Sequence, residues 1–326
     1  MGIPNCTLLI SSAGRRVELI RCFRRDAEAL GIALIVIATD AQPEFSAACQ
    51  VADFAYQVPK CTDSHFLFCV LDICRKHQVD LLVPTIDPEL AIYAAHMQSF
   101  EDAGVTISLS SPRVVQIAGN KYETYRYFKT NGIAVPQTCL SRDFYYENDV
   151  LEYPVILKPM QGSSSLGIFK IKSAAELPPY ELVQDYVVQE MMQGAEYTVN
   201  MYFDRHSDCR ATIPHKRLSV RAGEVATGET ERRGDLAAVS EQIAACLAGA
   251  RGVLCYQAII TELNEVGVFE INARFGGGYP LAHQAGATFT RWLLEETAGL
   301  PCSANDNWKS GVRMLRYDAA EYTCEK

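Results

Sequence analysis

Apolar and polar positions follow two periods in the first third of the chain. Short apolar runs have the length of buried strands, and between them apolar residues recur every three or four positions, the spacing of one helix face. The predicted strands are 7–10, 33–38 and 80–84, and the predicted helices are 17–30, about 64–76 and one after Pro88. This alternation predicts a parallel sheet with helices on both faces, which binds ligands at the carboxyl ends of its strands.

The pattern changes after Ser111-Pro112 and becomes rich in strands. A helix at about 121–131 ends at Asn131-Gly132, a favourable left-handed cap. Predicted strands follow at 154–157, 167–172, 186–190, 196–203, 210–213, about 253–260 and 266–272, with helices at about 236–250 and 281–298. We therefore expect an N-terminal α/β domain at 1–111 and a second domain at 112–326.

Composition excludes several classes of protein. The 326 residues carry 30 basic and 39 acidic side chains, a net charge of −9, which argues against nucleic acid as the main partner. No apolar run approaches the ~20 residues of a membrane helix, and no signal peptide is visible. The twelve cysteines are scattered without a C-x-x-C pair. We expect a cytoplasmic protein with no membrane contact and no structural zinc.

The first segment that carries chemistry joins a strand to a loop of small residues. Lys158 ends the apolar run 153–157, and a half-buried lysine is costly unless an anion neutralises it. The loop 161–167 can bring backbone N–H groups close to phosphate oxygens, although it matches neither the P-loop nor the Rossmann pattern. The alternative is a β-hairpin with a flexible turn and a solvated lysine.

The second segment, 188–199, contains two strands that meet at a short turn. Met191 and Met192 could form an apolar slot for an adenine ring, and Glu196 could accept hydrogen bonds from ribose hydroxyls. Glu190 ends the first strand. The alternative is a surface hairpin whose carboxylates are solvated.

The third segment, 266–278, places an acid, an amide and an arginine at the end of an apolar strand. The alternation predicts one strand face with Val268, Glu270 and Asn272 and another with Phe269 and Ile271. Carboxylate and amide oxygens two residues apart suit Mg²⁺. We expect Gln257, on the preceding strand, to lie opposite Glu270, and Arg274 follows directly.

These three segments, together with Lys121, resemble the ATP-grasp superfamily. The resemblance implies that Lys121 and Lys158 bind the nucleotide, that 161–167 is the phosphate loop and that 190–196 is the adenine–ribose hinge. The implied magnesium ligands are Gln257, Glu270 and Asn272, with Gln where the family commonly has Asp.

The segment 270–274 with Gln257 looks most like the carbamoyl phosphate synthetase large subunit. The openings 11–16 and 84–90 resemble stand-alone members of that branch, including the pyrrolysine-pathway amide ligase, and the likeness runs from about residue 6 to 300. It implies a Rossmann-like pre-ATP-grasp domain, a mobile lid at about 135–188, and ATP held between the lid and a C-terminal α+β part. A carbamoyl phosphate synthetase joins two such units, so this chain is too short for that activity.

The activity that the resemblance implies is an ATP-dependent carboxylate–amine ligase that makes an acyl phosphate, with ATP and Mg²⁺ or Mn²⁺ as cofactors. The predicted nucleotide-binding residues are Lys121, Lys158, Gly162, Ser163, Ser164, Ser165, Glu190, Met191, Met192 and Glu196. The predicted catalytic residues are Arg274, Lys158 and Arg217.

The predicted substrate residues lie mostly after the strands of the first domain. Arg15 and Arg16 could clamp a carboxylate, and Asp87 or Glu89 could receive an ammonium group. Arg221, with the basic run 215–217, could help at the γ-phosphate or bind the acid; the alternative is a solvated basic turn.

Two other functions stay open. One is a non-catalytic ATP-binding or regulatory protein, which would not need Arg274. The other is a nucleotide-dependent oxidoreductase, prompted by the turn 11–16 and Asp40, although only Gly14 of the expected glycines is present. The expected partners are a small-molecule carboxylate and an amine. The sequence leaves open whether the attacking amine is ammonia, an amino acid or a peptide. It also leaves open whether the protein is a homodimer.

Overall fold

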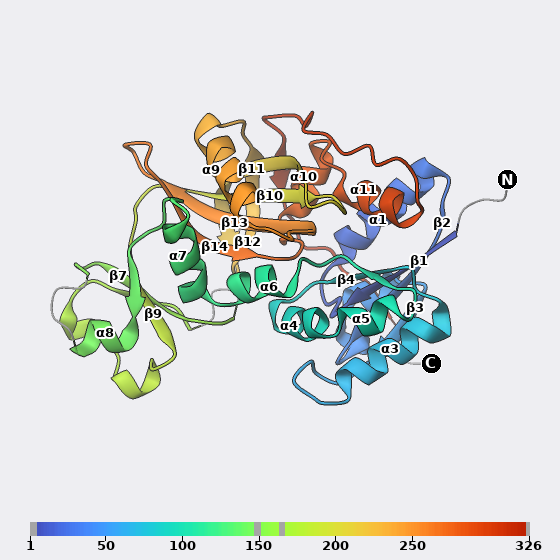
Figure 1. The fold of residues 1–326 in the computed structure, drawn as a ribbon, viewed down its shortest axis with the longest axis horizontal. Helices are drawn as coiled ribbons and strands as arrows, with labels where there is room; N and C mark the ends of the chain where they lie inside the picture. The colour runs from blue at the N-terminus through green and yellow to red at the C-terminus, as the bar shows by residue number, and fades with distance from the viewer. Residues whose placement is uncertain (1–4, 147–150, 163–166, 324–326) are drawn as a thin grey trace.

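The computed structural model of the protein describes residues 5–146, 151–162 and 167–323. Figure 1 shows three sheets, with the N-terminal sheet at one end, a small sheet at the other, and the largest sheet between them. The mixed α/β architecture agrees with the expected fold class. Within the described ranges, no helix is long and apolar enough to cross a membrane.

The N-terminal sheet has five parallel strands in the order β3-β2-β1-β4-β5. Its strands are β1 (Asn5–Ser11), β2 (Ala33–Asp40), β3 (Phe54–Gln57), β4 (Leu81–Pro84) and β5 (Thr106–Ile107). The helices are α1 (Val17–Leu30), α2 (Ala47–Val51), α3 (Phe66–His77), α4 (Asp87–Ala95) and α5 (Met97–Glu101), with a 3-10 turn, η1, at Pro43–Phe45. Because all strands run the same way, the loops after β1, β2 and β4 meet at one edge.

Helices α6 (Pro112–Gly119) and α7 (Lys121–Thr130) lead to the small sheet. Its four antiparallel strands, in the order β6-β9-β7-β8, are β6 (Thr138–Leu140), β7 (Val155–Pro159), β8 (Phe169–Ile171) and β9 (Tyr186–Glu190). It also carries α8 (Ser141–Tyr146) and the 3-10 turns η2 (Ala174–Glu176) and η3 (Tyr180–Leu182). A small buried cluster of its own lies around Val155 and Leu157. The domain boundary at 112 and the lid limits stay predictions.

The largest sheet has six antiparallel strands in the order β14-β13-β10-β11-β12-β15. They are β10 (Ala195–Phe203), β11 (Cys209–Arg221), β12 (Glu224–Thr230), β13 (Gly252–Ile260), β14 (Val266–Asn272) and β15 (Arg313–Leu315). The helices are α9 (Gly234–Cys246), α10 (Tyr279–Gln284) and α11 (Phe289–Thr297).

Two sequence expectations in this region are wrong. The strand expected at 210–213 continues to Arg221 and pairs with β12, which rules out the alternative of a solvated turn at 215–217. The single helix expected at 281–298 is two helices, and Gly286 between them has a φ of +105°, which a helix does not tolerate.

The N-terminal sheet and the largest sheet share their cores. Two buried clusters each take residues from both, for example Leu9 with Leu254 in one and Leu8 with Trp292 in the other. Asp26 of α1 is buried, and its carboxylate accepts hydrogen bonds from His283 Nε2, at 3.0 Å, and from the Thr290 hydroxyl. These two hydrogen bonds connect α1 to α10 and α11.

Candidate active site

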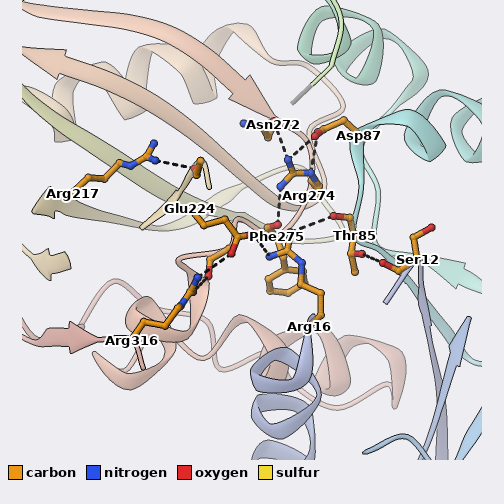
Figure 2. A network of polar contacts seen from close by, with 12 residues as sticks. Ser12, Arg16, Thr85, Asp87, Arg217, Glu224, Asn272, Arg274, Phe275 and Arg316 are labelled. Carbon is orange, nitrogen blue, oxygen red and sulfur yellow. Dashed lines mark hydrogen bonds and ion pairs between the residues drawn. The ribbon is translucent and has the colours of Figure 1, made fainter. Parts of the chain in front are cut away.

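A cleft lies where the carboxyl end of β4 faces strands β11 to β14 (Figure 2). Its empty volume is about 660 Å³, open solvent included. It is lined by Arg16, Thr85, Ile86, Asp87, Thr198, Arg217, Gly223, Glu224, Val225, Cys255, Gln257, Glu270, Asn272, Arg274 and Gly276–Gly278.

The acid–amide pair of β14 opens into this cleft. Gln257 is the cross-strand partner of Glu270, as expected, and Asn272 Nδ2 donates to Glu270 Oε1 at 3.1 Å. The expectation that Val268 shares a face with Glu270 is wrong. The register shifts between Gln257 and the next residue of β13, so β14 carries a bulge that turns Val268 to the core side, where Ile271 also packs.

The donor set of this strand end suits a divalent cation that is bound mainly by a ligand's phosphates. Glu270 offers a carboxylate, and Asn272 and Gln257 offer amide oxygens. Within the described residues, no cluster of three His, Cys, Asp or Glu side chains could hold a metal. Mg²⁺ is commonly held by one or two carboxylates and the substrate phosphates, so the residues present fit this mode and not an all-protein cage.

Lys158 is a buried cation beside this pair. It is 4% exposed, and its Nζ lies 3.5 Å from the carbonyl oxygen of Phe269 and over that residue's ring. Burial lowers the pKa of Lys158 to about 8, although Glu270 pulls the pKa upwards. Within the described ranges, no carboxylate lies within 4 Å of this ammonium group. The second predicted lysine, Lys121, donates to the Gly162 carbonyl at 2.8 Å.

The turn between β9 and β10 contributes no described residue to the lining of the cleft. Glu190 exchanges two hydrogen bonds with Gln137, through its backbone N–H at 2.8 Å and its Oε2 at 3.1 Å. Met191 and Met192 are half-buried, and Met192 Sδ packs over Gly267, where a Cβ would come within 2.2 Å. The predicted residues Ser163, Ser164 and Ser165 lie outside the described residues.

Arg217 cross-links three strands of the largest sheet. Its Nη1 donates to Glu196 Oε1 at 2.6 Å and to Gln257 Oε1 at 2.7 Å, and its Nη2 donates to the Gly223 carbonyl at 2.9 Å. The neighbouring His215 is fully buried, and burial lowers its pKa to about 3, so it is neutral at physiological pH. Arg217 therefore joins the predicted ribose carboxylate to a predicted metal residue.

Arg274 connects α4 of the N-terminal region with β14 of the largest sheet. Its guanidinium donates two hydrogen bonds to the Asp87 carboxylate, at 2.9 and 2.5 Å, and a third to Asn272 Oδ1 at 3.3 Å (Figure 2). Burial alone would lower the pKa of Arg274, but Asp87 outweighs burial and raises it. Asp87 is thus already paired with a cation of this chain.

A second chain of charges runs along the other wall. Arg16 donates to the Thr85 carbonyl at 3.4 Å and lies 3.6 Å from Glu224. Arg316 donates to Glu224 at 2.9 Å and to the Gly277 carbonyl at 2.6 Å (Figure 2). Glu224 therefore neutralises one arginine from the N-terminal sheet and one from the last segment of the chain.

Comparison with known proteins places this geometry in a family. Residues 8–108 match the model of the PylC-like N-terminal domain, and residues 118–278 match the model of the ATP-grasp domain. The chain belongs to the ATP-grasp superfamily. The curated relatives include a D-alanine–D-alanine ligase of Marinomonas sp., 33% identical over 139 residues, with 37% of this chain and 43% of that protein covered. Another from Phocaeicola vulgatus is 24% identical over 202 residues, covering 54% and 61%.

The matched stretches thus span less than two thirds of these ligases. Solved ATP-grasp structures have the same fold. A biotin carboxylase from Campylobacter jejuni superposes with a TM-score of 0.75 at 14% identity, covering 94% of this chain and 74% of that one. An L-amino acid ligase from Bacillus licheniformis gives a TM-score of 0.71 at 16% identity, covering 94% and 78%.

Three of the predicted substrate residues of this ATP-grasp protein do not line the cleft. Arg15 is exposed, and Arg221 donates to Asp318 on the surface. Glu89 is 0% exposed and accepts hydrogen bonds from the hydroxyls of Ser11 and Ser12, both at 2.8 Å, and from two backbone N–H groups after β4. This carboxylate is saturated by protein donors, so it has no free side for an ammonium group.

Glu224, which lines the cleft, and Arg316, which pairs with Glu224, were not predicted from the sequence. Glu224 follows Ala222-Gly223, whose turn signal predicts a hairpin and no chemistry. Arg316 follows the three-residue strand β15 at the edge of the largest sheet. No local sequence pattern indicates that Glu224 pairs with both Arg16 and Arg316.

Proposed function

We propose that the protein is an ATP-dependent ligase that joins a carboxylate to an amine through an acyl phosphate. The γ-phosphoryl group of ATP passes to a carboxylate oxygen, and ADP leaves. The amine nitrogen then forms a bond to the acyl carbon as the bond to the phosphate oxygen breaks, which gives an amide, phosphate and a proton. Support comes from the ATP-grasp family match and from relatives named as ligases of D-alanine and of L-amino acids.

The observation that carries this proposal is the buried Lys158 beside Glu270. A desolvated ammonium group with no carboxylate within ion-pair distance in the described structure would stabilise an anion bound beside Glu270. Glu270 repels phosphates, so a triphosphate at this place requires a cation between them. Phosphoryl transfer is catalysed mainly by such positioning and neutralisation, with no covalent nucleophile.

The chain's own residues divide into three tasks. Lys158 and Lys121 bind phosphate oxygens, the turn 190–196 receives the adenosine, and Glu196 accepts a ribose hydroxyl while Arg217 orients it. Glu270 and Asn272, with Gln257, would hold Mg²⁺, which when bound supplies positive charge at the β- and γ-phosphates.

Arg274 would stabilise the negative charge that develops on the transferred phosphoryl group or the acyl oxygen. Asp87, first expected to bind an ammonium group, instead fixes the direction of Arg274 by its two hydrogen bonds. We place the carboxylate substrate near Arg16, because that guanidinium lies on the wall formed by the N-terminal sheet.

Release of ADP and phosphate, measured against pairs of amino acids and small acids, tests the proposal. We expect turnover with at least one pair, its loss in Glu270→Gln, and its retention in the matched control Glu262→Gln, an exposed carboxylate in the β13–β14 turn. Equal turnover in Glu270→Gln and the wild type would contradict it. ATP binding without turnover on any pair would favour the non-catalytic ATP-binding protein, and a change in NADPH fluorescence on mixing would favour the oxidoreductase.

The homodimer and the cytoplasmic location stay predictions. A single-particle mass of twice 36.1 kDa by light scattering would support the dimer.

A further inference from the structure

A second cavity lies between the N-terminal sheet and the largest sheet. Its empty volume is about 560 Å³, open solvent included. Arg205, from the turn between β10 and β11, and Arg251, just before β13, line it together with Glu296 of α11. Leu81, Ile107 and Leu293 supply an apolar wall. The cavity thus combines charged groups with a surface that suits a carbon skeleton.

The cations of this cavity outnumber its carboxylates. Within the described ranges, the Arg251 guanidinium makes no hydrogen bond and no ion pair. The Arg205 guanidinium donates to the ring of His206, at 3.3 Å, and to no carboxylate. Glu296 is the one carboxylate among the described lining residues, and its Oε1 already accepts the backbone N–H of Arg205 at 3.2 Å. With two guanidinium groups and one carboxylate, the cavity carries a net positive charge.

A buried hydroxyl group in the cavity wall also lacks a partner. Ser108 is 6% exposed, and its Oγ forms no hydrogen bond with any described residue. It lies against Gly252, where a Cβ would come within 2.7 Å of the hydroxyl, so a side chain there would displace it. A buried hydroxyl is usually hydrogen-bonded, and an acceptor in the cavity would satisfy it.

We propose that this cavity binds a small organic acid, whose carboxylate or phosphate group lies between Arg205 and Arg251 and whose carbon chain packs against Leu81 and Leu293. Guanidinium groups match both kinds of oxyanion in a bidentate geometry. The Ser108 hydroxyl donates a further hydrogen bond.

The cavity is separate from the cleft. Leu81 begins β4 and lines the cavity, whereas Thr85, four residues on, lines the cleft. Gly252 begins β13 and lines the cavity, and Gln257 lines the cleft five residues later. Cys255 also lines the cleft, three residues after Gly252, so at about 3.3 Å per residue the two sites are about 10–13 Å apart along these strands. An acid in the cavity contacts both sheets, so its binding raises the melting temperature of the protein.

Calorimetric titration of the full chain tests this site with three probes: butyrate, n-propyl phosphate and the uncharged butyramide. We expect at least one acid to bind and to raise the melting temperature, and butyramide to bind at least tenfold more weakly. The two acids distinguish a carboxylate ligand from a phosphate ester.

The variants Arg251→Gln and Arg205→Gln should each weaken binding of that acid about tenfold, because each removes a charge-assisted hydrogen-bonding group. Arg75→Gln, an exposed arginine on α3, is the matched control and should bind as the wild type does. Arg251→Lys keeps the charge but loses the planar guanidinium group. Its affinity for the acid should lie between those of the wild type and Arg251→Gln. The proposal is overturned if neither acid binds, if both glutamine variants bind normally, or if only Arg16→Gln weakens binding, which would place the anion in the cleft.

Discussion

Replacing Lys158 by Met should stabilise the nucleotide-free protein and abolish its stabilisation by ATP. Met has nearly the same length and no charge, so it fills the same space at the end of β7. The lysine is 4% exposed, so its charge is not screened by solvent. A residue that is costly to fold around and needed for a ligand is typical of a binding site.

The magnitude follows from the pKa of Lys158, which burial lowers from 10.5 to about 8. Between pH 8 and 10.5 the unfolded chain binds the proton more tightly than the folded one, so stability rises with pH through this window. At pH 7 the charged lysine therefore costs up to about 3 kcal/mol relative to its neutral form. The contact with Phe269 returns about 1 kcal/mol, so we expect a net gain of about 1–2 kcal/mol in the variant.

The assay is thermal unfolding at pH 7 with and without ATP and Mg²⁺. We expect the variant to melt at a higher temperature than the wild type without nucleotide, and ATP to raise the melting temperature of the wild type alone. Lys170→Met, an exposed lysine on β8, is the matched control and should leave both values unchanged. A variant that is less stable than the wild type, or that ATP still stabilises, would refute the reasoning.

Three further predictions address other parts of the molecule. Asp87→Asn leaves Arg274 buried without its partner and should lower stability by about 3 kcal/mol by urea unfolding and kcat/KM about a hundredfold; normal turnover would contradict the positioning role. Burial lowers the pKa of His283, but the contacts with Asp26 and Cys22 together outweigh burial and raise the pKa to about 9. The resulting stability, up to about 3 kcal/mol, is complete below pH 6.5 and is lost as the pH rises towards 9, so melting temperatures over pH 6.5–8 should fall in the wild type and fall less in Asp26→Asn. Glu89→Gln should lower the free energy of unfolding by about 2 kcal/mol and leave the KM of the acid substrate unchanged. A changed KM would indicate that Glu89 contacts the substrate after all.

The sequence was sufficient to predict strands and helices whose apolar periodicity can be recognised within a few consecutive residues. The strands at 186–190 and 266–272 have the predicted bounds, and Gln257 lies opposite Glu270 because a short turn fixes the register of a hairpin. The bulge in β14 was not predictable in this way, since one extra residue changes the face of Val268 without changing the apolar pattern.

The remaining features depend on contacts between distant segments. Arg274 and Asp87 are 187 positions apart, and only the packing of the two large sheets shows that they neutralise each other. Glu89 carries the same chemistry as Asp87 in the sequence, yet it is turned inward and saturated by hydroxyl and N–H donors. The chemistry of single residues therefore predicted which residue types the site needs. Only the fold shows which of these residues can contact a ligand and which are already paired with another residue of the chain.

The most direct test of the cleft as a nucleotide–metal site is a crystal structure of the protein with ADP and Mn²⁺, in which anomalous scattering locates the metal. The account predicts a manganese peak coordinated by Glu270 and by a phosphate oxygen, with the diphosphate in hydrogen-bond range of Lys158 Nζ. Nucleotide bound elsewhere on the molecule, or manganese away from Glu270 with Lys158 still unpaired, would contradict it.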